Sequence, residues 1–212
     1  MYQPAHFVEQ RPELLHALIA AYPLASLMLV GPDGIEANPV PLLLDPARGP
    51  LGTLYGHVAI NNPLLALAGQ PALVQFHGPD AYVSPGWYPS KQAGGKVVPT
   101  WNYALVEARG PLQTVSNPTR LEAILSALTD RFEASQPEPW TLDHAPADFR
   151  SQLYRAIVGI EIPLTSLTGK FKLSQNRPAA DYAGTLAGLA AEGSPHALAV
   201  ADWMQRTKPL TA

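Results

Sequence analysis

Leu54-Tyr-Gly-His-Val-Ala-Ile-Asn-Asn-Pro63 is a stretch in which a strand pattern runs directly into a helix start. Its first half is rich in strand-forming residues. At its end, Asn62 can accept a hydrogen bond from an early helical N–H group, and Pro63 at the first helical position has no N–H to leave unpaired. The stretch therefore predicts a strand that carries His57 towards the N-terminus of a helix.

This junction offers several groups that bind anions. A ring nitrogen of His57, the side-chain amides of Asn61 and Asn62, free backbone N–H groups and the positive end of a helix dipole would lie close together, which suits a phosphate. A simpler interpretation is that His57 is a half-buried sheet residue and that Asn62 is only a helix cap. The stretch by itself favours the simpler interpretation.

The rest of the chain is divided into short elements, because its 23 prolines interrupt longer ones. Apolar runs predict strands over residues 24–30, 35–44, 71–76, 81–84, 96–114 and 158–167. Apolar periodicity and capping residues predict helices over residues 11–21, 63–68, 118–132, 148–157, 178–191 and 195–205. We also expect the strand at 24–30 to be buried on both faces, hairpin and strand-reversing turns at 32–34 and 77–80, and an exposed, aromatic-rich binding loop at 85–95.

This order of elements predicts an α+β chain, mainly β. Short strands would form an antiparallel barrel or sheet in the middle, with helices on its edges and at its C-terminal end. No Gly-rich turn joins a strand to a helix in a βαβ unit, which excludes a Rossmann fold, and no Walker sequence is present. We expect a domain over residues 1–176 and a helical extension over residues 177–212.

The composition narrows the classes of partner. Only 15% of the 212 residues are charged, which favours a partly buried surface and hence self-association. A net charge of −3 gives no electrostatic footprint for nucleic acid, so direct DNA binding is doubtful. The absence of cysteine excludes disulfides and a cysteine nucleophile and fits the cytoplasm. We expect no signal peptide and no membrane span.

Polar side chains gather in four segments that otherwise resemble strands or loops. The groups are His57 with Asn61 and Asn62; Ser84 with Trp87, Tyr88 and Lys91; Lys96 with Thr100, Trp101 and Asn102; and Lys170 and Lys172 with Ser174, Gln175 and Asn176. If the segments converge, they form a site with cationic and amide donors and aromatic walls, which suits a phosphorylated aromatic ligand. Each group taken separately is better explained as a solvated loop, a cap or a half-exposed strand.

Two other chemistries find little support. The six histidines are scattered, with no pair at helical i, i+4 spacing, so we predict no metal site. Ser84 lies in Val-Ser-Pro-Gly, which is not a nucleophile elbow.

Several motifs together resemble those of one family. They are MYQPAHF at 1–7, GHVA at 56–59 with NP at 62–63, YVSP at 82–85 with WY at 87–88, VPTWNY at 98–103 and KLSQN at 172–176. In this order, over nearly the whole chain, they are similar to the PaiB family. The resemblance implies an FMN-binding negative transcriptional regulator with the split β-barrel fold of pyridoxamine phosphate oxidases and flavin reductases. It also implies a homodimer with FMN at the subunit interface.

The resemblance further implies roles for the polar segments. The strand of His57 and the amides of Asn61 and Asn62 would lie against the flavin ring and ribityl chain, with His57 as the candidate catalytic group. The phosphate and ribityl groups would be faced by Lys96, Thr100, Trp101 and Asn102. The cleft would be closed by Lys172, Ser174, Gln175 and Asn176, and Trp87 and Tyr88 would form a lid. No arginine lies on these strands, so a lysine and helix-end amides would hold the phosphate.

Three functions remain open on the sequence. The first is an FMN-binding regulator, which would act through a partner or a metabolite because no basic recognition helix is present. The second is an FMN-dependent oxidoreductase that takes electrons from NAD(P)H and reduces a flavin or a small aromatic substrate. The third is a flavin carrier or a dimeric scaffold.

Overall fold

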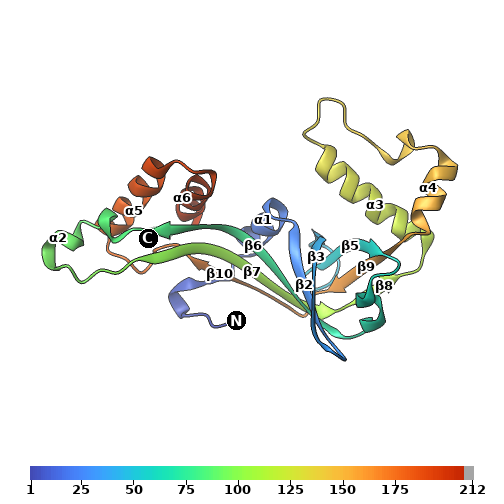
Figure 1. The fold of residues 1–212 in the computed structure, drawn as a ribbon, viewed down its shortest axis with the longest axis horizontal. Coiled ribbons are helices and arrows are strands. Elements are labelled where there is room, and N and C mark those ends of the chain that lie inside the picture. Colours follow the sequence, from blue (N-terminus) through green and yellow to red (C-terminus); the bar gives the residue numbers. More distant parts are fainter. Residues whose placement is uncertain (208–212) are drawn as a thin grey trace. The chain divides into compact units, whose positions relative to one another are not determined.

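A computed structural model describes the backbone of residues 1–207 and their side chains except that of Ala93. The chain divides into two compact units (Figure 1). Unit 1 is formed by residues 1–21, 77–106 and those from 168 onward, and unit 2 by residues 22–76 and 107–167. Two long strands, β6 (Pro71–Val83) and β7 (Thr100–Pro111), contribute residues to both units.

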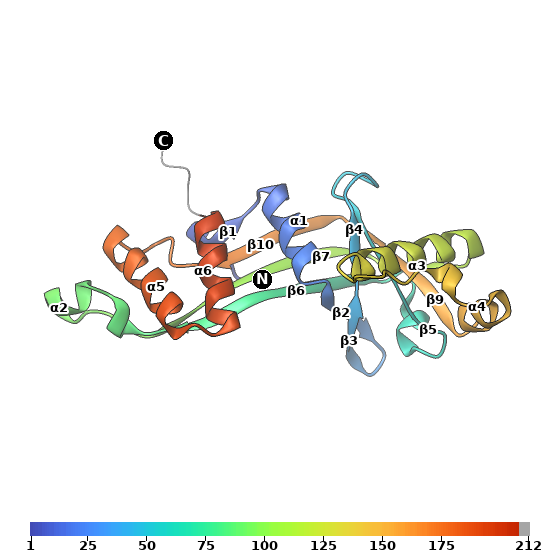
Figure 2. The ribbon, with the colours of Figure 1, turned by 90° about the horizontal axis from the view of Figure 1, so that it is seen from above.

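Unit 1 is a sheet with helices on one face. The strand order is β1 (Val8–Glu9), β10 (Ser166–Lys172), β7 and β6. Helices α1 (Pro12–Ala21), α5 (Ala179–Glu192) and α6 (Pro195–Thr207) lie over these strands (Figure 2). Phe171 of β10 meets Trp203 of α6 edge to face, with the ring centroids 5.6 Å apart. The short elements are η1 (Ala5–Phe7), η3 (Pro85–Trp87) and α2 (Ser90–Gly94).

The other face of this sheet carries exposed aromatic rings and a lysine. Trp101 is 54% exposed and meets the ring of Tyr82 edge to face, with centroids 6.2 Å apart. The ammonium group of Lys170 lies 5.6 Å from the ring centroids of both Tyr2 and Tyr103. Such a concentration of exposed aromatic surface is typical of an interaction face.

Unit 2 holds the other end of the six-stranded sheet that includes β6, and a separate four-stranded sheet. In one, β6 pairs with β2 (Leu24–Gly31), which pairs with β3 (Gly34–Pro41) at the edge. The other has the order β4 (Leu43–Asp45), β5 (Thr53–Ala59), β9 (Ile157–Pro163) and β8 (Gln113–Val115). Helices α3 (Pro118–Glu133) and α4 (Ala147–Tyr154) and the 3-10 helices η2 (Pro63–Leu67) and η4 (Leu142–His144) complete it. Leu43, Ile124 and Leu128 form a buried cluster that joins the second sheet to α3.

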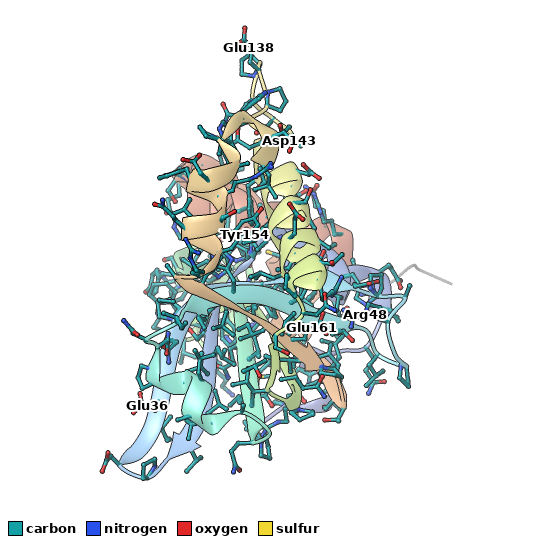
Figure 3. The ribbon with its side chains drawn as sticks, turned by 90° about the vertical axis from the view of Figure 1, so that its right-hand side faces the viewer. Glu36, Arg48, Glu138, Asp143, Tyr154 and Glu161 are labelled. Carbon is teal, nitrogen blue, oxygen red and sulfur yellow. The ribbon has the colours of Figure 1, made fainter. Side chains whose placement is uncertain are left out.

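A buried carboxylate anchors α3 to this sheet. Glu161 on β9 is 7% exposed and accepts two hydrogen bonds from Arg48, at 2.7 and 2.8 Å, and one from Arg120 of α3, at 2.6 Å. Figure 3 shows Arg48 beside Glu161 at the foot of α3. The two guanidinium groups, Arg48 first, lower the pKa of Glu161. The buried carboxylate of Glu161 therefore has the opposite charges and the hydrogen bonds that a buried ion requires.

Local capping signals identified most helices correctly. The predictions over 11–21, 118–132, 148–157, 178–191 and 195–205 correspond to α1, α3, α4, α5 and α6. Asn117 caps α3 by accepting the N–H of Arg120, and Ser194 Oγ accepts the N–H of Ala197 at the start of α6. The Asp33-Gly34 turn joins β2 to β3 as expected. No helix in the described part of the chain has the length and apolarity needed to cross a membrane.

The predicted strand boundaries were wrong where a Pro-Leu dipeptide occurs. Residues 35–44, 96–114 and 158–167 were each expected as one strand, but β3, β7 and β9 end at Pro41, Pro111 and Pro163. The leucine that follows each proline is buried. Its N–H donates a hydrogen bond to a backbone carbonyl in another segment: Leu42 to Pro23, Leu112 to Gln70 and Leu164 to Gly52. Proline has no N–H for the ladder, so the chain leaves one strand at these points and enters another element.

Two further expectations need correction. The turn expected at 77–80 is absent, because β6 continues through these residues. Up to Phe76 the buried residues of β6 have even numbers, and from Pro79 onward they have odd numbers. A β-bulge, which inserts one extra residue into a strand, produces such a change. The strand at 24–30 is not buried on both faces: burial alternates in β2, and Leu24 and Val30 are 63% and 73% exposed. The short helix expected at 63–68 is present as a 3-10 helix over Pro63–Leu67.

Candidate functional site

A small cavity in unit 1 brings together residues from two of the polar segments. Its volume is about 140 Å³, and it is lined by Phe7, Thr100, Asn102, Lys172, Ser174, Asn176 and Arg177. The first strand residues of β7 form one wall and the end of β10 with its following turn forms another. Five of the seven lining residues are among those expected from the sequence.

The turn after β10 is held by its own side chains. Ser174 has a φ of 66°, which is the left-handed region, and the N–H of Arg177 bonds the carbonyl of Ser174 at 3.0 Å. The Gln175 amide accepts the N–H of Leu173 and donates to the carbonyl of Phe171. Because both ends of this amide bond the backbone, Gln175 braces the turn and does not line the cavity.

Asn102 fixes the turn from the opposite strand. Its side chain is fully buried; it donates to Ser174 Oγ at 3.0 Å and accepts from the same hydroxyl at 3.2 Å. The Asn102 amide also lies 3.6 Å from the sulfur of Met204 on α6. Buried amides need such partners, so Ser174 is locked against β7 and α6.

Two cations approach the cavity without a countercharge. Lys172 Nζ donates to Thr100 Oγ1 and to the carbonyl of Trp101. Burial, and then the nearby charges of Arg177 and Lys170, lower the pKa of Lys172. Among the residues that the structure describes, neither Lys172 nor Arg177 forms an ion pair with a carboxylate. A cavity with two uncompensated cations and amide and hydroxyl donors is suited to an anion.

Arg177 is the lining cation that the sequence analysis left out. It follows directly on Asn176, so the signal that could have found it was its position next to the KLSQN motif. It lies in the turn after β10 and not on a strand. Arg177 thus adds a second cation to the lysine that the sequence analysis expected near the phosphate.

Several predicted site residues lie elsewhere. Lys96 is exposed and Trp101 points its side chain to the exposed face of the sheet, so neither side chain lines the cavity. The segment of His57, Asn61 and Asn62 belongs to unit 2. The structure thus brings together Thr100, Asn102, Lys172, Ser174 and Asn176 and leaves the other candidates outside this cavity.

At the junction after β5, both ends of the Asn62 side-chain amide form hydrogen bonds within the protein. Its oxygen accepts the N–H of Leu64 at 3.0 Å, and its nitrogen donates to Asn38 at 3.2 Å. The η2 helix that it caps has only five residues, too few for the dipole of a regular helix. The Nδ1 atom of His57 is buried and has no hydrogen-bond partner among residues 1–207, and burial lowers the His57 pKa. Asn62 is therefore the helix cap that the sequence predicts.

The expected exposed lid is packed against α5. Tyr88 is only 2% exposed, and Trp87 is half-buried. A Cβ atom at Gly188 would lie 2.1 Å from the Trp87 ring, so the indole rests directly on the helix backbone. The expectation of free aromatic side chains at 85–95 was wrong, because Gly188 of α5 leaves room for the Trp87 ring and Gly184 for the Trp87 backbone.

The donor set fits a phosphate monoester. Pockets that enclose a whole cofactor usually measure ~300–1,000 Å³. A cavity of about 140 Å³ accommodates only one end of such a molecule. Arginine, lysine, hydroxyl and amide donors are the groups that proteins use for phosphate oxygens.

Comparison with solved structures identifies the class of fold. The FAD and heme binding protein from Mycobacterium smegmatis matches 89% of this chain and 80% of its own, with a TM-score of 0.56 and 20% identity. The flavocytochrome Anf3 from Azotobacter vinelandii matches 84% of this chain and 75% of its own, with a TM-score of 0.60 and 16% identity. The fold is that of the flavin-binding split β-barrel class, as the sequence predicted.

Sequence comparison identifies the family. Residues 1–166 match the family described as "Putative FMN-binding domain". The protease synthase and sporulation protein PAI 2 of Bacillus subtilis is 31% identical over 154 residues, or 72% of each chain. An uncharacterized protein of Emericella nidulans is 33% identical over 226 residues, 89% of this chain and 90% of that one. The chain belongs to this family of FMN-binding proteins, and its cofactor is FMN.

Proposed function

We propose that the cavity in unit 1 binds the phosphate of FMN. The observation that carries this proposal is the pair of cations, Lys172 and Arg177, that face one small cavity without a carboxylate partner in the described residues. Arg177 supplies a planar fork of donors that matches two phosphate oxygens, and Lys172 supplies a point charge. The hydroxyl of Ser174 and the amide of Asn176 add directional donors.

This assignment is tested by titration with FMN. The flavin fluorescence should be quenched saturably by the purified protein. Thermal unfolding should shift upward with FMN concentration, because a ligand that binds only the folded state stabilises it. Unchanged fluorescence and an unchanged unfolding temperature would reject the assignment.

A homodimer would complete the cofactor site. A cavity of about 140 Å³ encloses the phosphate end and leaves the ring to another surface. Unit 2 exposes three large aliphatic side chains on the β2–β3 hairpin, Leu24, Val30 and Ile35, at 63%, 73% and 76%. With only 15% charged residues, the chain has the surface expected of a self-associating protein. Light scattering coupled to gel filtration should therefore give twice the mass of 22.7 kDa.

A regulatory role is the first candidate for activity. It is supported by the resemblance to PaiB-type regulators and by the Bacillus subtilis relative, whose name refers to protease synthesis and sporulation. The net charge of −3 argues against direct DNA contact, so the regulation would act through a partner protein or a metabolite. A gel shift with promoter DNA at low and moderate salt tests this; specific retardation by the pure protein would contradict it.

An FMN-dependent oxidoreductase is the second candidate. FMN supplies the redox chemistry when it is bound, and the chain holds and orients it. His57 favours this function, because its buried Nδ1 has no hydrogen-bond partner among the described residues and is free to bond a ligand or substrate atom. Substitution His57→Ala should preserve FMN binding and reduce turnover with NAD(P)H and an acceptor. Absence of turnover by the unmodified protein with any donor would leave the regulatory role.

A further inference from the structure

The guanidinium group of Arg177 lies over an aromatic ring. Its carbon is 4.8 Å from the ring centroid of Tyr88, which is the geometry of a cation–π contact. A guanidinium that lies over a ring leaves its N–H groups directed outward at its edge. Arg177 also lines the cavity. The ring of Tyr88 can therefore hold one face of Arg177 while its edge remains available to an anion.

Two contacts from α5 fix the segment that carries Tyr88. Ser90 donates its N–H to Asp181 at 3.1 Å and its hydroxyl to the same carboxylate at 2.6 Å, and Asp181 is 2% exposed. On the other side of Tyr88, the Trp87 ring rests on Gly188. The chain on both sides of Tyr88 is thus fastened to one helix. The ring has little freedom to move away from Arg177.

The ring of Tyr88, and not its hydroxyl group, makes this contact. The Tyr88 hydroxyl oxygen is buried and has no hydrogen-bond partner in the described structure. A tyrosine kept only for stability would normally satisfy this group. The contact that remains is the one between the ring face and Arg177.

We propose that Tyr88 is a positioning residue that preorients Arg177 for a tetrahedral oxyanion in the unit 1 cavity. The proposal rests on the proposed function, because the anion is taken to be the phosphate of FMN. It adds that α5, which lies outside the family-matched residues 1–166, controls the affinity of the site through Ser90, Trp87 and Tyr88. Preorientation lowers the conformational cost of binding, so loss of the ring should weaken anion binding about three- to tenfold.

The test compares inorganic phosphate with chloride in the full-length protein. Unfolding temperatures are measured over a phosphate titration and over a chloride titration at matched ionic strength, and the difference gives an apparent Kd for phosphate. The variants are Tyr88→Leu, which removes the aromatic face, Tyr88→Phe, which keeps it, and Arg177→Lys, which keeps the charge but removes the planar fork. A general loss of stability affects both titrations equally and does not change the difference.

We expect Tyr88→Leu and Arg177→Lys to raise the apparent Kd for phosphate and Tyr88→Phe to keep the unmodified value. A Tyr88→Leu protein that keeps the unmodified Kd overturns the inference, and so does an unmodified protein that does not distinguish phosphate from chloride. Failure of the proposed function is visible separately. If the variants change the apparent Kd for phosphate as expected but the protein does not quench FMN fluorescence, Tyr88 positions Arg177 for an anion and the proposed binding of FMN in this cavity is wrong.

Discussion

Asn102 and Ser174 are joined by two hydrogen bonds, at 3.0 and 3.2 Å, although they lie 72 positions apart in the chain. The contact ties β7 to the turn after β10 and is fully buried at Asn102. It holds Ser174 in the cavity wall beside Lys172. The polar interior of unit 1 thus serves both stability and the shape of the anion site.

The Asn102→Leu substitution should destabilise the protein by about 2–4 kcal/mol, because it leaves a buried hydroxyl group without its partner. FMN affinity should fall as well. Urea denaturation gives the first quantity and fluorescence titration the second. The matched control is Asn61→Leu: Asn61 is exposed and has no side-chain bond in the described structure, so its unfolding free energy should change by less than about 0.5 kcal/mol.

Substitutions at Ser174 can separate the cost of its left-handed backbone conformation from the contribution of its hydroxyl hydrogen bonds to the unfolding free energy. Its φ of 66° is costly for a residue with a Cβ atom, and both Ser174→Gly and Ser174→Ala remove the hydroxyl. The glycine variant should be more stable than the alanine variant by about 1 kcal/mol. Equal unfolding free energies for the two variants would show that the left-handed conformation carries no strain here.

The Glu161 cluster predicts a loss of stability in acid. The pKa of Glu161 is lower in the folded than in the unfolded chain, first through Arg48 and then through Arg120. Its contribution is therefore complete above the unfolded pKa and is lost as the pH falls through the folded value. Urea denaturation between pH 7 and pH 3 should show this loss. The Glu161→Gln variant should be less stable at pH 7, and its stability should depend less on pH below about 4.5.

His57 predicts a second, milder pH effect. Burial lowers its pKa in the folded state, so the unfolded chain binds a proton first as the pH falls. Stability should then be full above the unfolded pKa, about 6.5, and should decrease as the pH falls below that value. The His57→Gln variant should lack this component between pH 7 and pH 5. An NMR titration that places the His57 pKa at or above 6.5 would contradict the prediction.

Local signals predicted the helices well and the sheets less well. Caps such as Asn117 and Ser194 are set by a few neighbouring residues, so the sequence shows them directly. The residue at which a strand ends depends on which distant carbonyl accepts the next backbone N–H, as at Leu42 and Leu112. The local sequence does not show that carbonyl. The prolines before them are a local signal that could have placed these boundaries.

The cavity was predictable in part. Thr100, Asn102 and Lys172 were recognisable as candidates because they are polar residues in strand-like segments, where buried polar groups need hydrogen-bond partners. Which segments converge depends on the division of the chain into units, and the sequence does not reveal that His57 belongs to the other unit. The packing of Trp87 depends on Gly184 and Gly188 of α5, about 100 residues away, a relationship that no local pattern contains.

The most direct test of the phosphate assignment is the ratio of two affinities, for FMN and for riboflavin, which differ only by the phosphate. Charge-assisted hydrogen bonds contribute about 1.5–3 kcal/mol each, so the unmodified protein should bind FMN at least about tenfold more tightly. The Lys172→Met and Arg177→Met variants should reduce this ratio towards one while leaving riboflavin affinity unchanged. Equal affinities of the unmodified protein for FMN and riboflavin would contradict the assignment.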